Sequence, residues 1–249
     1  MEYRSVERPT YTYTDPHGQT IDFVVPEPHN KICMNISGGA DSAIMLYMLV
    51  NYCHKHIPDA EIHVITCANV VKGWYNAKWS TTVLDKILEL TGTEIIKSHY
   101  TYYTDDQRRE ELDEVEILMN KLFNVTLTVH GTTQNPSADV THLQEGRVSK
   151  RDIGHDRPIF SNTWLENGKK VEKDMVRWMP VMHTDKRMIA YLYEHFDMLD
   201  KLLPFTRSCE QKSMDNKDTP SWMVTHCGEC WWCKEREWAF GKEIFKDEN

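Results

Sequence analysis

The hexapeptide Ser37-Gly38-Gly39-Ala40-Asp41-Ser42 has the residue types that a phosphate-binding loop needs. Its adjacent glycines would let the backbone approach an anion closely, and the N–H groups of a following helix would offer partial positive charge. Ser37 and Ser42 add hydroxyl donors. The loop lacks the Lys of a Walker-type loop and the spaced glycines of a dinucleotide fingerprint, so it indicates another kind of phosphate chemistry.

Asp41 is the informative residue of this loop, because a carboxylate beside bound phosphate is repulsive. The repulsion disappears if a divalent cation lies between the two groups, or if the carboxylate caps the start of the helix. Magnesium therefore belongs to the predicted site. The alternative is a Gly-Gly turn that binds no ligand, which the complete hexapeptide after a strand disfavours.

Four cysteines near the C-terminus have the spacing of a metal site: Cys209, Cys227, Cys230 and Cys233. The last three recur at intervals of three, so their thiols can converge on one ion, and Cys209 supplies a fourth. Four thiolates in a tetrahedron suit structural zinc, which would stabilise a tail that has little core. An iron–sulfur cluster and unliganded, reduced cysteines are the alternatives, and His183 or His226 could replace a thiol.

An α/β domain is predicted around the phosphate loop, because short apolar runs that favour strands alternate with amphipathic runs that favour helices. Strands are expected at 31–36, 61–66, 94–97 and 125–129, and helices at 42–52, 79–90, 112–122 and 185–199. Elements of these lengths favour a doubly wound, mainly parallel sheet that binds ligands beyond the carboxyl ends of its strands. The phosphate loop follows the first of these strands.

Three regions are expected along the chain. Residues 1–30 form a hairpin that leads into the core. Residues 31–203 form the main α/β domain, with 134–178 as an irregular active-site insertion. Residues 204–249 form a small module around the cysteines.

The composition indicates an ordinary globular protein with one main core. Its 249 residues are 40% hydrophobic and 27% charged, and the formal net charge of −9 argues against binding to nucleic-acid backbone. The start of the chain has no apolar signal segment and no run is long enough to span a membrane, which predicts a cytoplasmic protein without a membrane partner. The acidic run at 110–116 is expected to be the solvated face of a helix; it comprises Glu110, Glu111, Asp113, Glu114 and Glu116.

The phosphate loop resembles the Ser-Gly-Gly-x-Asp-Ser loop of the ATP pyrophosphatases, or PP-loop enzymes. The resemblance implies that the loop holds the pyrophosphate part of ATP while the α-phosphoryl group is transferred to an acceptor oxygen. The main domain, 31–203, would then be the ATP-binding domain, with Mg²⁺ as the companion of ATP. The implied ATP-binding residues are Ser37, Gly38, Gly39, Ala40, Asp41 and Ser42.

The tail is similar to the Cys-Gly-x-Cys-x-x-Cys-x-x-Arg-x-x-Ala-Phe ending of the 7-cyano-7-deazaguanine synthase family. The matching residues are Cys227, Gly228, Cys230, Cys233, Arg236, Ala239 and Phe240. Phe205-Thr206-Arg207-Ser208-Cys209 resembles the segment that carries the family's first zinc ligand. Pro180-Val181-Met182-His183-Thr184-Asp185-Lys186 resembles its Pro-Leu stretch with a following Lys. The resemblance therefore covers both ends of the fold.

This family resemblance implies an ATP-dependent ligase that converts 7-carboxy-7-deazaguanine and ammonia to 7-cyano-7-deazaguanine. ATP would adenylate the carboxylate, ammonia would displace AMP to give an amide, and a second adenylation would permit dehydration to the nitrile. Asp41 and Lys186 are the implied catalytic residues, with Lys186 neutralising charge beside the backbone N–H groups and Mg²⁺. A solvated Lys186 in the first turn of its helix is the alternative. A homodimer is the usual assembly of the family.

The segment that follows strand 125–129 departs from the family, which carries a Tyr-Pro-Asp-Cys-Arg stretch near its base-binding pocket. Here the sequence is Gly131-Thr132-Thr133-Gln134-Asn135-Pro136. Gly131, Thr133 and Asn135 are the predicted acceptor-binding residues, because they follow a strand at the ligand-binding edge; a polar turn is the alternative. Two other hypotheses stay open. One is adenylation of a different acceptor, such as a modified nucleobase, a tRNA base or a protein carboxylate, and the other is nucleotide binding without turnover.

Overall fold

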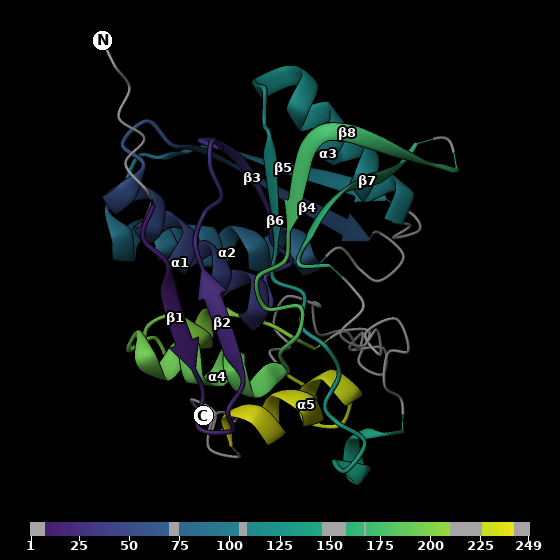
Figure 1. The fold of residues 1–249 in the computed structure, drawn as a ribbon. Helices are drawn as coiled ribbons and strands as arrows, with labels where there is room; N and C mark the ends of the chain where they lie inside the picture. Colours follow the sequence, from purple (N-terminus) through teal and green to yellow (C-terminus); the bar gives the residue numbers. More distant parts are fainter. Residues whose placement is uncertain are drawn as a thin grey trace.

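The computed structural model describes residues 8–69, 75–104, 109–145, 158–166, 168–209 and 226–241 (Figure 1). The strands are β1 Tyr11–Thr14, β2 Thr20–Phe23, β3 Lys31–Asn35, β4 Glu61–Asn69, β5 Ile96–Thr104, β6 Leu127–His130, β7 Phe160–Glu166 and β8 Lys169–Trp178. The α-helices are α1 Ala40–His56, α2 Tyr75–Thr91, α3 Arg109–Phe123, α4 Lys186–His195 and α5 Trp231–Phe240. Two 3₁₀ turns are η1 Thr141–Leu143 and η3 Leu203–Phe205.

A six-stranded sheet of order β5-β4-β3-β6-β8-β7 forms the centre of the molecule. All its neighbouring strands pair in parallel except β7, which pairs antiparallel with β8. In β3 the residues Ile32, Cys33 and Met34 are all buried, as expected for a strand that is covered on both faces. The predicted α/β fold with a mainly parallel sheet is therefore confirmed.

Helices cover the two faces of this sheet. Ile32 and Met34 of β3 belong to the large core that also contains the apolar residues of α1. Cys33, which points to the opposite face, belongs to a second core with Met119 of α3. Because successive residues of a strand face opposite sides, α1 and α3 must lie on opposite faces.

The direction of the connections reverses between β3 and β6. Helices α1 and α2 lead from β3 outward to β4 and β5, and α3 then returns the chain so that β6 lies on the other side of β3. Asn35 and His130, the last residues of β3 and β6, lie opposite each other in register. A crevice at such a reversal is where open α/β sheets bind their ligands.

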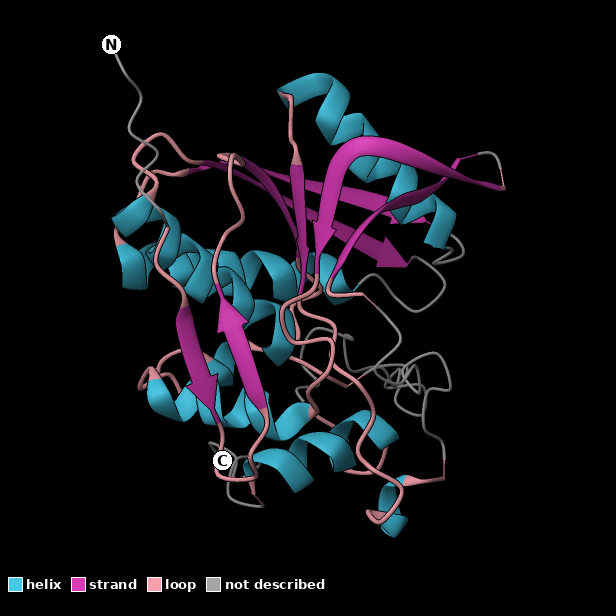
Figure 2. Ribbon diagram, viewed as in Figure 1, coloured by secondary structure: helices cyan, strands magenta, loops and turns pink. Residues whose placement is uncertain are grey.

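Within the region 1–30, where a hairpin is expected, β1 and β2 pair antiparallel and stand apart from the main sheet (Figure 2). Its Tyr13 ring packs against the rings of His195 and Phe196 at the end of α4. The hairpin therefore covers α4 rather than extending the sheet.

The predicted insertion at 134–178 is not irregular throughout. Its second half forms β7 and β8, and β8 adds to the main sheet beside β6. The prediction was wrong here because the outer part of this hairpin is rich in charged residues, such as Lys170, Glu172 and Lys173. It therefore lacks the apolar–polar alternation by which a strand is recognised in a sequence. The positive φ of 75° at Gly168 is the turn that the Asn-Gly pair in the sequence signals. Residues 146–157 and residue 167 of the predicted insertion lie outside the described residues.

Two residues of the acidic run at 110–116 are buried, which contradicts the prediction of a solvated face. Asp113 is 1% exposed and Glu116 is 0% exposed, whereas Glu114 is exposed as predicted. The physical reason is that the β7–β8 hairpin lies over α3 and brings Arg177 of β8 against both carboxylates. A counter-charge from a distant strand makes their burial tolerable.

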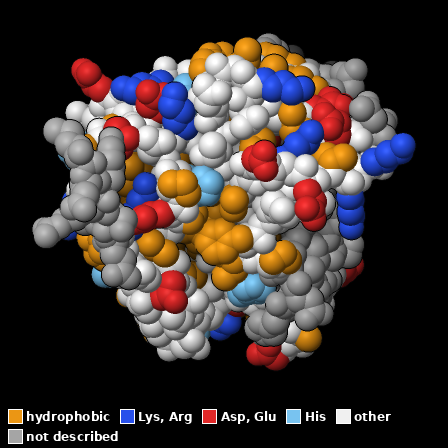
Figure 3. All heavy atoms as spheres, turned by 45° about the horizontal axis from the view of Figure 1, so that its top comes forward, with side chains coloured by type: hydrophobic (Ala, Val, Ile, Leu, Met, Phe, Trp, Pro, Cys, Tyr) orange, Lys and Arg blue, Asp and Glu red, His pale blue; other side chains and the backbone are white. Residues whose placement is uncertain are grey.

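The surface drawn in Figure 3 carries Lys, Arg, Asp and Glu side chains interspersed with apolar ones. This mixture differs from the single-sign basic surface that binds nucleic-acid backbone. None of the helices within the described ranges is long and apolar enough to cross a membrane.

Candidate functional site

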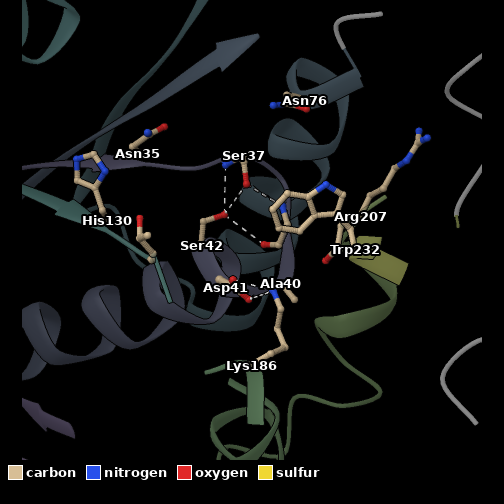
Figure 4. A pocket seen from close by; sticks show the side chains of 14 residues that line it. Asn35, Ser37, Ala40, Asp41, Ser42, Asn76, His130, Lys186, Arg207 and Trp232 are labelled. Carbon is tan, nitrogen blue, oxygen red and sulfur yellow. Dashed lines mark hydrogen bonds and ion pairs between the residues drawn. The ribbon is translucent and has the colours of Figure 1, made fainter. Parts of the chain in front are cut away.

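A cavity of about 280 Å³ lies at the carboxyl ends of β3 and β6. Five parts of the chain line it: the phosphate loop, the ends of these two strands, the start of α2, the start of α4 and the segments beside the cysteines. The lining residues are Asn35, Ser37, Gly39, Ala40, Asp41, Ser42, Asn76, His130, Gly131, Thr132, Lys186, Arg207, Ser208 and Trp232. In the view of Figure 4, His130 and Asn35 lie at one end and Arg207 and Trp232 at the other, with the phosphate loop between them.

The phosphate loop holds its shape through its own hydroxyl groups. Ser42 Oγ accepts a hydrogen bond of 3.2 Å from the Ser37 N–H and donates one of 3.2 Å to the Gly39 carbonyl oxygen. Gly38 has φ +79°, and a Cβ there would lie 2.6 Å from Trp79 Cβ, so only glycine fits. Gly39 has φ −81°, and a Cβ there would lie 3.3 Å from its nearest neighbour, Ser37 Oγ. Gly38 is therefore required by the fold, whereas Gly39 keeps the mouth of the loop open.

The start of α1 is open to an anion. Gly39 is the N-cap and makes no side-chain capping bond, and its own N–H donates to Ser37 Oγ at 3.3 Å. The free N–H groups of a helix start carry partial positive charge and bind phosphate readily. Asp41 lies in this turn but does not cap it.

Asp41 forms a buried ion pair with Lys186. Lys186 is 3% exposed, and its Nζ lies 2.6 Å from Asp41 Oδ1 and 2.7 Å from Oδ2. A second carboxylate, that of the fully buried Glu235 on α5, lies 3.6 Å from the same Nζ. The structure thus brings together the two residues predicted to be catalytic, and the alternative of a solvated Lys186 is wrong. The cation that neutralises Asp41 is supplied by the chain itself.

Of the three predicted acceptor residues, only Gly131 lines the cavity. A Cβ at Gly131 would lie 3.0 Å from the backbone of Asp41, so glycine lets the end of β6 approach the first turn of α1. Thr133 and Asn135 are 2% and 6% exposed and do not line the cavity. The reason is that the chain turns away after Thr132, where the Gln134 N–H donates to the Thr184 carbonyl oxygen at 2.9 Å.

Several cavity residues were missed by the sequence analysis, and their signals were of two kinds. Asn35 and His130 are polar residues that end apolar strands, which is the position that faces a ligand at a parallel sheet edge. Arg207, Ser208 and Trp232 are sequence neighbours of the predicted metal ligands, so they had to lie wherever the metal module docks. No local sequence pattern indicated where in the fold the metal module would lie.

A buried charge network lies directly behind His130. His130 Nε2 is 2.6 Å from Glu116 Oε1, and Glu116 Oε2 accepts hydrogen bonds from Arg177 at 2.6 Å and from Trp164 Nε1 at 2.9 Å. Asp113 also accepts from Arg177, at 2.6 Å. Burial alone would raise the pKa of the Glu116 carboxyl, but His130 and Arg177 outweigh it and lower that pKa to about 2. Glu116 is therefore an ionised carboxylate that can only accept hydrogen bonds.

The four predicted metal ligands converge on one point. All four sulfur atoms lie within 4.8 Å of one another, and the pairs Cys227–Cys233 and Cys230–Cys209 are each 3.8 Å apart. Four thiolates arranged tetrahedrally at about 2.3 Å from a zinc ion would be about 3.8 Å apart. His226 Nδ1 is 3.8 Å from Cys233 Sγ, and burial, followed by the nearby Arg236, lowers the pKa of His226 to about 4. The donor set fits a single metal ion, with His226 as a neutral neighbour.

The cysteine module, whose described parts are 204–209 and 226–241, forms one wall of the cavity. The Arg207 N–H donates to the Gly38 carbonyl oxygen at 2.8 Å, and Trp232 lies between two of the clustered cysteines in sequence. The buried Arg236 donates to Thr206 Oγ1 at 2.8 Å and to the Leu203 carbonyl oxygen at 3.0 Å. These bonds hold the segment before Cys209 against the helix that follows Cys230.

Comparisons with known proteins leave the activity to be argued from this site. No protein-family model matches the chain, and no curated protein matches it in sequence. Among solved structures, the U34-tRNA thiolase NcsA from Methanococcus maripaludis with its [4Fe-4S] cluster is 21% identical at a TM-score of 0.42. That match covers 68% of this chain and 58% of the thiolase, which is less than two thirds of its length. NMN synthetase from Francisella tularensis is 11% identical at a TM-score of 0.44, over 87% of this chain and 79% of the synthetase.

Proposed function

We propose that this chain is an ATP-dependent enzyme of the PP-loop type, which adenylates an acceptor oxygen and releases pyrophosphate. The observation that carries the proposal is the loop at the start of α1. The loop has a left-handed turn at Gly38, a helix start without a side-chain cap, and two serine hydroxyls. It lies at the carboxyl end of β3, where the order of the strands reverses between β3 and β6. Oriented donors of this kind stabilise a transferring phosphoryl group without reorganisation.

In the proposed reaction, the pyrophosphate portion of ATP lies against the loop while the acceptor oxygen attacks the α-phosphorus. The new oxygen–phosphorus bond forms as the bond between the α-phosphorus and the bridging oxygen breaks, and pyrophosphate leaves with the electron pair. Mg²⁺ bound to ATP would neutralise part of the charge on the phosphates. Lys186 keeps the Asp41 carboxylate neutralised, so that the first turn of α1 does not repel them.

We infer that the acceptor is 7-carboxy-7-deazaguanine, with ammonia as the nucleophile that displaces AMP and 7-cyano-7-deazaguanine as the final product. The tail resemblance motivates this choice. The wall that carries Trp232 and Arg207 supports it, because a flat indole and a guanidinium suit a planar heterocycle that bears a carboxylate. Thr133 and Asn135 do not support it, since they lie away from the cavity.

The ion in the cysteine cluster is proposed to be zinc with a structural role. Sulfur atoms 3.8 Å apart match four thiolates on one ion. An iron–sulfur cubane binds each thiolate to a different iron, so its cysteine sulfurs must stand further apart. Metal analysis of protein purified without oxygen distinguishes the two: one zinc per chain agrees with the proposal, and four irons with acid-labile sulfide contradict it.

The test of function is product analysis with Mg-ATP, 7-carboxy-7-deazaguanine and ammonium. We expect AMP and pyrophosphate to form only when the acid is present, and mass spectrometry to detect the amide and then the nitrile. The absence of AMP release and of binding with this acid would remove the substrate assignment.

A different acceptor is the second candidate, favoured by the segment 131–136 and by the burial of Thr133 and Asn135 outside the cavity. AMP release with tRNA or another modified base, but not with the acid, would support it. Tight ATP binding without AMP formation with any acceptor would instead indicate a binding protein. A homodimer stays a prediction, which light scattering on the purified protein tests.

A further inference from the structure

His130 is the cavity residue best placed to handle a proton. It ends β6 opposite Asn35 of β3, and its side chain is 11% exposed where it lines the cavity. The next residue, Gly131, lies so close to the first turn of α1 that a Cβ on it would be 3.0 Å from the Asp41 backbone. His130 therefore lies beside the phosphate loop, on the side of the cavity away from Trp232 (Figure 4).

The contact with Glu116 fixes which ring nitrogen of His130 carries the proton. Glu116 is ionised and can only accept, so the 2.6 Å contact requires that Nε2 donates. Nδ1 then holds a lone pair. In the described part of the chain, no hydrogen-bond partner is found for Nδ1. A carboxylate that sets the tautomer of an imidazole, with the second nitrogen free, is the arrangement of a general base.

The buried network behind His130 carries net negative charge. Asp113 and Glu116 carry two negative charges against the single positive charge of Arg177, and all three side chains are at most 5% exposed. Protonation of His130 would balance the remaining charge at a distance of 2.6 Å. The Cys33 thiol on β3 adds no charge, because burial and then Glu116 raise its pKa.

Other charged groups face the cavity from elements around His130, and they are largely paired. Lys186 on α4 is bound by Asp41 on α1, with Glu235 on α5 nearby. Arg207 lies at the opposite end of the cavity (Figure 4). Among the described lining residues, His130 is thus the side chain that can offer a nitrogen lone pair to a proton.

We propose that His130 is the catalytic base of the second half-reaction, and that Glu116 is the residue that positions it. The inference rests on the proposed adenylation. Ammonia attacks the acyl carbon of the adenylate, the nitrogen–carbon bond forms, and Nδ1 of His130 accepts the proton that the attacking nitrogen must lose. The bond between that carbon and the phosphate oxygen then breaks, and AMP leaves with the electron pair.

The test separates the two half-reactions in a His130→Gln variant. The first is acid-dependent exchange of labelled pyrophosphate into ATP without ammonium, and the second is ammonium-dependent amide formation. General-base catalysis contributes about 10²- to 10⁴-fold, so amide formation should fall by at least 10²-fold and the exchange by far less. The matched control is His54→Gln, an exposed position on α1, which should leave both rates as in the wild type.

The pH profile gives a readout that a purely structural role would not change. At a constant concentration of free ammonia, the amide-forming rate should fall on the acidic side in the wild type, and this limb should be absent from His130→Gln. Glu116→Asp, which keeps a carboxylate, should recover part of the rate that Glu116→Gln loses. Equal losses in both half-reactions, or an unchanged acidic limb, would overturn the inference.

Nitrogen NMR of labelled protein tests the tautomer without any acceptor. We expect a protonated Nε2 and an unprotonated Nδ1 in the neutral ring of His130, and loss of this preference in Glu116→Gln. A proton on Nδ1 instead would overturn the inference on its own. If the wild type shows no acid-dependent exchange, the proposed function has failed; if it does and His130→Gln makes amide normally, only the base assignment has failed.

Discussion

The backbone N–H of Arg207 donates a hydrogen bond of 2.8 Å to the carbonyl oxygen of Gly38. Arg207 precedes the first clustered cysteine by two positions, and Gly38 is the one residue of the phosphate loop with a left-handed backbone. The bond therefore joins the segment before the cysteine cluster to the phosphate loop. A second link runs through Lys186 of α4, whose Nζ lies 3.6 Å from Glu235 of α5 and 2.6 Å from Asp41 of the loop. The metal ion and the phosphate loop should thus depend on each other.

Removal of the metal is expected to weaken ATP binding as well as stability. Cys230→Ser should lose the bound ion, lower the melting temperature and reduce the affinity for Mg-ATP, because Arg207 and Trp232 would lose their positions. Metal analysis, thermal unfolding and calorimetry measure the three effects. Cys67→Ser, a cysteine of β4 outside the cluster, is the control and should keep its ion. A Cys230→Ser protein that retains metal and melting temperature contradicts the structural role.

The two glycines of the phosphate loop should respond differently to alanine. Gly38→Ala forces a left-handed backbone on alanine and brings its Cβ to 2.6 Å from Trp79, so the free energy of unfolding should fall by at least about 2 kcal/mol. In Gly39→Ala the new Cβ meets no atom closer than 3.3 Å, so the free energy of unfolding should stay within about 1 kcal/mol of the wild-type value. Its methyl group would block the approach of phosphate, so its affinity for Mg-ATP should fall at least about tenfold, or about 1.4 kcal/mol. Normal ATP affinity in Gly39→Ala would show that phosphate does not bind there.

Lys186 should matter for stability as well as for activity. Lys186→Met leaves Asp41 and Glu235 without their cation, and loss of one partner of a buried pair costs about 3–5 kcal/mol. Adding Asp41→Asn to Lys186→Met should restore about 1 kcal/mol of the free energy of unfolding, because the asparagine carries no charge that needs the lost cation. Denaturant unfolding of the single and double variants measures the coupling. Lys201→Met, an exposed lysine, is the control and should stay within about 0.5 kcal/mol of the wild type.

Glu116 should make stability depend on acid pH. Its pKa is about 2 in the folded protein against 4.5 normally, so the unfolded state binds the proton first. The stabilisation, about 3 kcal/mol, is present above pH 4.5 and is lost as the pH falls toward 2. The stability difference between wild type and Glu116→Gln should therefore shrink between pH 6 and pH 3. A constant difference over this range would show that the carboxylate is not held ionised by His130 and Arg177.

The sequence by itself determined the features that depend on neighbouring residues. Apolar runs such as that of β3 predicted the buried strands, since a strand covered on both faces has no polar alternation. The Gly-Gly pair predicted the phosphate loop, because the left-handed turn at Gly38 is a property of the backbone there. The three cysteines from Cys227 to Cys233 predicted a metal site for the same reason: short spacing brings their thiols together whatever the rest of the chain does.

Only the tertiary structure decided how charges pair and which side chains reach the cavity. Lys186 and Asp41 are 145 positions apart, and Glu116 became a buried residue only because Arg177 arrives on β8. The burial of an ionised group depends on a distant counter-charge, which no local pattern records. Thr133 was misplaced for a related reason, since the direction of the chain after β6 is set by a backbone hydrogen bond to the segment before α4. Local periodicity encodes the elements, whereas the contacts between distant elements decide the chemistry of the site.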